Sequence, residues 1–218
     1  MKKLLLFFIF LMPLALFAKF YDGKVIYKSG ETVDLQINFP LNPRSKKLTV
    51  KIDGKTQKLD PNEIAYFTVS IDNGNSTFVF RRIEIWGFDK NGKMSEHNFF
   101  GITKGWAMVD KVYKNMIVYD LGDKYGIKKV RGKERMVVAY WVGMGSNSNL
   151  IGKPDEDITF VLFDTSTDGA FKKGLERAEK YLFDKCPNFS EKFNIKEMNR
   201  KEIIAYQIAE FYDKCAEN

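Results

Sequence analysis

The sequence predicts an α+β fold, in which a mainly antiparallel, β-rich body (residues 19–165) carries a C-terminal helical segment (residues 166–218) packed on it. Three observations lead to this class. Up to about residue 163 the chain reads as a series of strands, and in the early ones apolar side chains recur at every second position, the period of a strand with one buried face. Short pairs containing glycine or asparagine separate these runs, as in antiparallel hairpins. Beyond residue 164 the apolar spacing becomes three to four, the period of a helix. We expect the body to be a sandwich or a strongly curved, barrel-like sheet.

The first 18 residues have the pattern of a secretory signal peptide. Lys2 and Lys3 precede an apolar run from Leu4 to Phe17, and the small residue Ala18 follows it. The run is shorter than the roughly 20 residues that a membrane-spanning helix needs. We therefore expect cleavage after Ala18, no transmembrane helix after cleavage, and export to the periplasm, the cell surface or the medium.

The charge balance limits the classes of partner. The chain has 35 basic and 28 acidic residues, a formal charge of +7, which falls to +5 without Lys2 and Lys3. Both signs are interspersed along the sequence, and the excess is too small for a typical nucleic-acid-binding domain. We expect solubility, mild attraction to anionic surfaces and no nucleic-acid partner.

The early strands of the body follow one another in order. In TVDLQINF (residues 32–39) apolar and polar residues alternate, and residues 47–52 and 67–71 repeat this pattern. Turn-forming residues stand between the extended runs, and asparagine or aspartate with glycine tolerates the backbone angles of tight hairpins. The expected turns are Ser29-Gly30, Asp53-Gly54, Asp72-Asn73-Gly74-Asn75 and Asn91-Gly92.

Two later segments, residues 136–142 (MVVAYWV) and 158–163 (ITFVLF), are apolar at consecutive positions. Such runs are typical of central strands that are covered on both faces. The residues between them, 143–157, are polar and rich in glycine, so we expect a loop there.

Two helices are expected after residue 164. The first should begin with Asp168 as its cap and continue to Cys186, where Pro187 stops it. The second should begin near Asn199, with Glu202 completing a capping box. The first helix has an apolar stripe at Phe171, Leu175, Ala178, Leu182 and Cys186, and the second at Ile204, Ile208, Phe211 and Cys215. Phe189 and Phe193 indicate a short helical turn between them.

Cys186 and Cys215 are the only cysteines, and both are expected on buried helix faces, so a disulfide is favoured in an exported protein. A reactive dithiol would need closer spacing, and a zinc site would need more ligands than the single histidine, His97, supplies. A helix over residues 200–215 is about 24 Å long, whereas a disulfide needs Cα atoms within about 7 Å. The C-terminal ends of the two helices must therefore meet, with residues 187–199 returning the chain.

The densest basic stretch lies in GIKKVRGKERM. Its cations could bind lipid phosphates, an acidic polysaccharide or a protein, or they could only protect the edge of a sheet from pairing with other chains. The residues concerned are Lys128, Lys129, Arg131, Lys133 and Arg135.

Carboxylates and aromatic residues leave two further hypotheses open. Paired carboxylates could hydrolyse a glycan, and the candidates are Asp120, Asp123, Asp155, Glu156 and Asp157. The tryptophans could form a carbohydrate platform or, as is more common, pack within the core. They are Trp86, Trp106 and Trp141.

Both ends of the predicted mature chain resemble those of uncharacterised exported proteins of Gram-negative bacteria. The opening DGKVIYKSGETVDLQINF, the turn from Leu59 through Pro61-Asn62-Glu63-Ile64, and the closing segments YLFDKCP and FYDKC are similar to theirs. The resemblance implies export and this architecture, and it implies no catalytic residue. We expect a non-enzymatic binding or scaffolding domain of the cell envelope, without metal or cofactor, whose partner is an envelope protein or polysaccharide. A glycan hydrolase and a polyanion-binding module are the alternatives.

Overall fold

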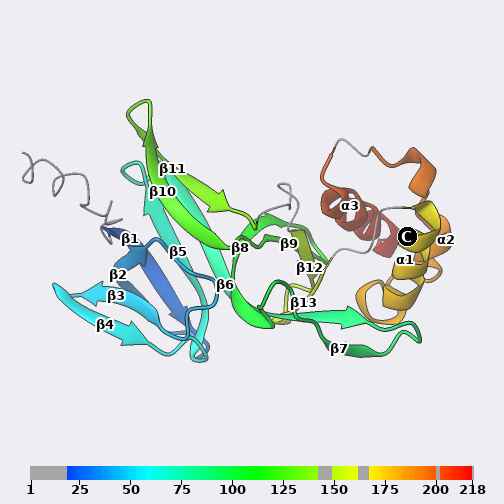
Figure 1. Ribbon diagram of the computed structural model, residues 1–218, viewed down its shortest axis with the longest axis horizontal. Coiled ribbons are helices and arrows are strands. Elements are labelled where there is room, and N and C mark those ends of the chain that lie inside the picture. Colours follow the sequence, from blue (N-terminus) through cyan, green and yellow to red (C-terminus); the bar gives the residue numbers. More distant parts are fainter. Residues whose placement is uncertain (1–18, 142–148, 162–166, 200–201, 218) are drawn as a thin grey trace, which may run out of the picture.

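The computed structural model describes residues 19–141, 149–161, 167–199 and 202–217. The molecule is elongated, with a twisted sheet at one end, a small barrel in the middle and helices at the other end (Figure 1). This confirms the α+β class and the barrel-like curvature of the β-rich part. The predicted signal peptide lies outside the described residues.

The chain is β-rich up to residue 161 and helical beyond it. The strands are β1 (Lys19–Tyr27), β2 (Thr32–Phe39), β3 (Leu48–Ile52), β4 (Lys55–Leu59), β5 (Ile64–Ile71), β6 (Ser76–Phe88), β7 (Met94–Glu96), β8 (Lys104–Val112), β9 (Ile117–Asp120), β10 (Lys124–Val130), β11 (Lys133–Ala139), β12 (Asn149–Gly152) and β13 (Ile158–Val161). The helices are α1 (Asp168–Leu182), α2 (Phe189–Lys192), the 3₁₀ turn η2 (Ile195–Glu197) and α3 (Ile204–Ala216).

The N-terminal sheet has the order β4-β3-β2-β1-β5-β6, and all of its neighbours are antiparallel. The predicted hairpins are confirmed: Gly54 and Gly74 have φ angles of 77° and 85°, which glycine adopts without strain. Alternating residues such as Val25, Ile37 and Phe67 are buried in one hydrophobic cluster. The β10–β11 hairpin covers this cluster and contributes Tyr125 to it.

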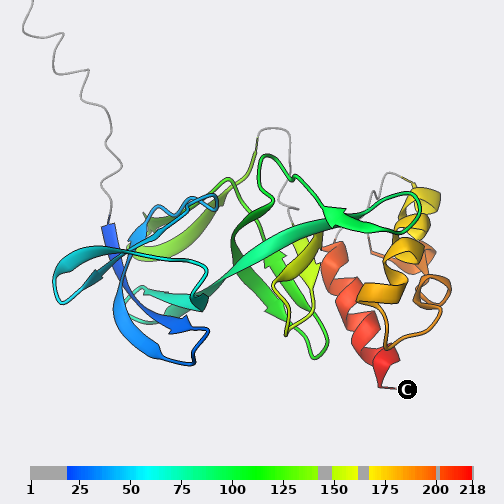
Figure 2. The same ribbon diagram turned by 90° about the horizontal axis from the view of Figure 1, so that it is seen from below.

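The barrel uses the second half of the long strand β6 (Figure 2). Its strands follow the order β6-β8-β9-β12-β13, and β13 closes the barrel by pairing with β6 in parallel. Ile83, Tyr119 and Leu150 are among the side chains that fill its interior. Because β13 lies between β12 and β6, the central strand predicted over residues 158–163 is confirmed for residues 158–161, and residues 162–163 lie outside the described residues.

The helices pack against the outside of the barrel. Val118 and Ile151 share a hydrophobic cluster there with Leu175 of α1 and Ile208 of α3. The helix starts differ from the sequence prediction. Thr167, one residue before Asp168, caps α1 by accepting a hydrogen bond from the Ala170 N–H.

The predicted capping box at the start of the second helix is wrong. Helix α3 begins only at Ile204, and its first turn has no side-chain cap. Asn199 instead donates its backbone N–H to Gln207 Oε1 at 2.9 Å and its side-chain amide to Glu202 Oε1 at 2.7 Å. These bonds hold Asn199 outside the helix.

Two predictions about the later strands are also wrong. Residues 133–139 form β11, which pairs with β10 in a separate two-stranded sheet and not at the centre of the large sheet. The expected loop over residues 143–157 contains β12, whose Leu150 and Ile151 are fully buried. Gly152 permits this close packing, because a Cβ atom there would lie 2.7 Å from the Ile158 carbonyl oxygen. The earlier part of that segment, residues 143–148, lies outside the described residues.

Candidate anion-binding surface

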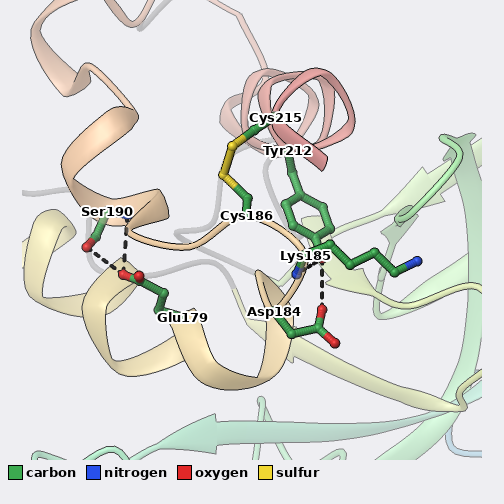
Figure 3. Close-up of a disulfide and its surroundings, with 7 residues drawn as sticks. All are labelled: Glu179, Asp184, Lys185, Cys186, Ser190, Tyr212 and Cys215. Atoms are coloured by element: carbon green, nitrogen blue, oxygen red, sulfur yellow. Dashed lines mark hydrogen bonds between the residues drawn. A yellow bond between two sulfur atoms is a disulfide. The ribbon is translucent and has the colours of Figure 1, made fainter. Parts of the chain in front are cut away.

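Cys186 and Cys215 form a disulfide that joins the end of α1 to the end of α3 (Figure 3). Their Cα atoms are 5.6 Å apart, so the C-terminal ends of the two helices meet as the sequence predicts. Helix α1 ends at Leu182 and not at Cys186, because Phe183 leaves the helical conformation. Cys186 is fully buried in the following turn. The disulfide is a structural clasp between two helices.

Polar groups around the clasp bond to one another. Tyr212 donates its hydroxyl to Asp184 at 2.9 Å and accepts the Lys185 N–H at 3.2 Å (Figure 3). Glu179 accepts the Ser190 hydroxyl at 2.7 Å. These groups serve as links between helical segments.

The β10–β11 hairpin, which we call the ribbon, carries the basic stretch. It projects from the barrel along one side of the N-terminal sheet (Figure 1). Cross-strand partners in an antiparallel pair point to the same face, and successive pairs alternate. Tyr125, Ile127, Met136 and Val138 pack on the N-terminal core, so the other set of side chains points outward. The cations in the outward set are Lys124, Lys128, Lys133 and Arg135.

The structure therefore divides the five predicted cations. Lys128 and Arg135 lie directly opposite each other on the outward face, and Lys133 follows on the same face. Lys129 is opposite Glu134 on the core side, and Arg131 forms the turn with a φ of 50°. Lys124 completes the outward set, although the sequence analysis did not identify it. The signal was the two-residue period that connects position 124 with position 128.

Among the described residues, no acidic side chain lies close enough to the outward cations to form an ion pair. Across the described part of the chain, no carboxylate lies within 4 Å of the Lys124, Lys128 or Lys133 ammonium or of the Arg135 guanidinium. Glu134, the nearest acid along the strand, is bound instead by Lys19 at 2.7 Å and by the Asp72 N–H at 3.1 Å. The hydrogen bond from Lys19 holds the pKa of Glu134 below its usual value. This acid therefore stays ionised and engaged.

A groove of about 340 Å³ lies between β10 and the adjoining ends of β1 and β2. Most of its lining is apolar, and lysines stand at its margin. The lining residues are Lys19, Tyr21, Phe39, Pro40, Lys124, Gly126, Ile127, Lys128, Val137 and Ala139. Two of the outward cations, Lys124 and Lys128, thus border an apolar hollow.

The candidate carboxylates are held in separate contacts. Asp123 pairs with Arg44 at 2.8 Å, while Asp157 pairs with Arg81 at 3.4 Å and with Lys28 at 3.2 Å. Glu156 accepts the hydroxyl of Tyr181. Asp155 and Asp157 both line a hollow of about 600 Å³, where the ion pairs already hold Asp157. These contacts make Asp123, Glu156 and Asp157 structural links.

Among the carboxylates of the described chain, Asp120 at the end of β9 has the most strongly shifted pKa. Asp120 is 9% exposed, and Tyr140 donates its hydroxyl to Asp120 Oδ2 at 2.7 Å. Its Oδ1 is buried and has no hydrogen-bond partner in the described structure. Burial raises the pKa of Asp120 to about 6, with a smaller contribution from the like charge of Asp110, while the Tyr140 bond acts in the opposite direction.

The tryptophans mainly pack. Trp106 is fully buried in the N-terminal core, and Trp86 packs against the helical cluster. Trp141 stacks on Phe100 with ring centroids 5.1 Å apart, and Phe100 is 48% exposed. Trp141 also packs against the barrel cluster, so the packing hypothesis is confirmed for all three tryptophans.

Two other classes of site have no candidate among the described residues. No group of three or more His, Cys, Asp or Glu side chains there could hold a metal ion. No described helix combines the length and the hydropathy needed to cross a membrane. Comparisons of the chain with protein-family models, with curated proteins and with solved structures returned no match.

Proposed function

We propose that the protein is exported to the cell envelope and acts there as a non-enzymatic binding domain for a polyanion. The ligand would lie on the outward face of the ribbon, against Lys124, Lys128, Lys133 and Arg135. The observation that carries the proposal is the gathering of these cations on one face, where no described carboxylate lies within 4 Å of them. Export is supported by the signal-peptide pattern and by the disulfide, which persists in oxidising compartments.

The arrangement of the ribbon is unfavourable without a partner. Like charges that face each other across two strands destabilise the pair, and Lys128 faces Arg135. A polyanion on this face would relieve the repulsion by neutralising both side chains at once. Edge protection alone would not require the cations to share a face, because isolated charges on an edge strand are sufficient for it.

The test compares two variants that lose the same charge. Lys128→Gln/Lys133→Gln/Arg135→Gln removes three outward cations of the ribbon. Lys46→Gln/Lys55→Gln/Lys58→Gln removes three exposed lysines from or beside the β3–β4 hairpin, which have no ion-pair partner among the described residues. We expect the ribbon variant to bind heparin, used as a model polyanion, at least about tenfold more weakly near physiological salt, where close charges still interact.

The control variant should retain most of the affinity of the wild-type protein. Equal loss in both variants would show that only net charge matters and would contradict a ribbon site. The same pair of variants should be assayed against acidic polysaccharide from a bacterial envelope. Hydrolysis of that polysaccharide, abolished in an Asp120→Asn variant, would favour the glycan hydrolase instead.

A further inference from the structure

We propose that the groove beside the ribbon binds one acyl chain, and that its ligand is a fatty-acid anion whose carboxylate pairs with Lys124 or Lys128. The inference rests on the proposed function, because it assigns a lipid class to the same cationic face. It is carried by the groove itself, by the glycine in its lining and by the lysines that also line it.

The lining of the groove is amphipathic. Phe39, which is 2% exposed, and the partly exposed Tyr21, Ile127 and Val137 are among its apolar lining residues. Ligand sites typically combine apolar walls with a few placed polar groups. The volume of about 340 Å³ is at the small end of the roughly 300–1,000 Å³ range for such sites. This size suits one chain and is small for a lipid with several chains.

Gly126 keeps the groove open. It is the middle residue of strand β10, where a glycine weakens the strand and usually marks a bulge or a close approach of other atoms. Neither reason applies here: Gly126 pairs regularly with Val137, its φ is outside the left-handed region, and a Cβ atom would meet nothing within 4 Å. Any larger side chain at this position would extend into the hollow.

The charges of Lys124 and Lys128 indicate an anionic head group for the ligand. Lys124 and Lys128 lie two residues on either side of Gly126, on the same outward face, and neither has a carboxylate within 4 Å in the described structure. Lys19 also lines the groove, but its ammonium is already bound to Glu134. Two uncompensated cations next to an apolar floor complement an anionic head joined to an apolar tail.

The experiment uses 11-(dansylamino)undecanoic acid, whose fluorescence rises in apolar surroundings, with displacement by laurate and by dodecylamine. We expect the wild-type protein to bind the probe and to release it to laurate but not to dodecylamine. Gly126→Ile should weaken laurate binding at least tenfold, because the new side chain fills the groove. Isoleucine is favoured in strands, so this variant should fold at least as well as the wild type.

A second variant separates charge from shape. Lys124→Gln/Lys128→Gln leaves the groove open, and we expect it to weaken laurate binding about tenfold while a neutral alcohol of the same chain length binds unchanged. Lys55→Gln/Lys58→Gln is the matched control and should bind laurate as the wild type does.

The failures of the two proposals are distinguishable. Ribbon-dependent heparin binding without any binding of the probe would overturn the acyl-chain site and leave the polyanion proposal standing. Laurate binding that Gly126→Ile abolishes, without ribbon-dependent heparin binding, would support the acyl-chain site and contradict the polyanion proposal.

Equal displacement of the probe by dodecylamine would overturn the proposal of an anionic ligand. A wild-type dimer that Gly126→Ile converts to a monomer, without probe binding, would identify a second copy of the chain as the occupant and overturn the inference.

Discussion

The helical segment and the ribbon are both attached to the barrel, but they differ in whether their charged side chains have partners. Asp213 of α3 accepts three hydrogen bonds from the β8–β9 turn, from the Lys114 N–H at 2.8 Å, the Asn115 N–H at 2.9 Å and the Asn115 amide at 3.0 Å. The outward cations of the ribbon have no comparable partner in the described structure. Satisfied polar groups fix one element on another, whereas unsatisfied ones remain available to a ligand.

The apolar residues differ in the same way. In the helical segment, Phe183 and Phe189 stack with ring centroids 3.8 Å apart, and both are fully buried. In the ribbon, one set of side chains reaches the core and the other set borders an open groove. We therefore expect changes in the helical segment to alter stability and changes in the ribbon to alter binding.

The largest effect is expected from removal of the disulfide. Cys186→Ala/Cys215→Ala releases a constraint between residues 29 positions apart, which should lower the free energy of unfolding by about 3.5 kcal/mol in the chain-entropy model. Urea denaturation monitored by circular dichroism measures the change. Heparin affinity should be unaltered in the folded variant, because the clasp and the ribbon are at different ends of the barrel (Figure 1).

Reduction supplies the control for that measurement. Dithiothreitol should destabilise the wild-type protein by a similar amount and leave the double variant unchanged. If the folded double variant lost heparin affinity, the separation of the two regions would be contradicted.

A smaller effect is expected at the base of the ribbon, where Tyr140 donates to Asp120. The folded-state pKa of Asp120, about 6, is above its ordinary value of 3.8. The native state therefore favours the protonated carboxyl, and the stability that this provides is fully present below about pH 3.8 and lost as the pH rises through 6. The full difference corresponds to at most about 3 kcal/mol.

Asp120→Asn should remove this pH dependence. Comparison of each protein with itself at pH 4 and pH 7 cancels the constant cost of placing an amide in the site. We expect the wild-type protein to lose up to about 2.4 kcal/mol more than the variant between these pH values. Parallel pH profiles would show that the buried carboxyl is not the titrating group, and Asp110→Asn tests the contribution of the nearby like charge.

The sequence predicts the local features of the fold well, because they depend on residues close together in the chain. Alternation over residues 32–39 and the Asp53-Gly54 turn determine a strand and a hairpin without reference to other segments. The disulfide is predicted from two cysteines on apolar helix stripes in a chain with a signal-peptide pattern, and the distance limit then predicts that the helix ends meet. The parallel pairing of Ile158 with Glu84 depends on segments 74 positions apart, which no local period reveals.

The candidate site shows the same limit. The basic stretch is visible in the sequence, but its division between two faces depends on the register that pairs Lys128 with Arg135. The groove combines Phe39 with Gly126, and an isolated glycine in a strand is not a signal for a ligand. Residues 136–142 are apolar on both faces, and such a run does not by itself indicate a central strand. One face of it can pack on a core while the other lines a hollow.

The smallest effect on stability is expected from the variant with the largest expected effect on polyanion binding. Lys128→Gln/Lys133→Gln/Arg135→Gln removes no buried group and no ion pair of the described residues, and exposed substitutions usually change the free energy of unfolding by no more than about 0.5 kcal/mol. Loss of the repulsion between Lys128 and Arg135 should make the change slightly stabilising at low salt. Urea denaturation at low and high salt measures this change in stability.

A loss of 2 kcal/mol would mean that the cations support the fold, and the ribbon would then resemble the helical segment. A neutral or stabilising change together with weaker heparin binding is the pattern of side chains kept for a ligand, because folding alone would favour their replacement.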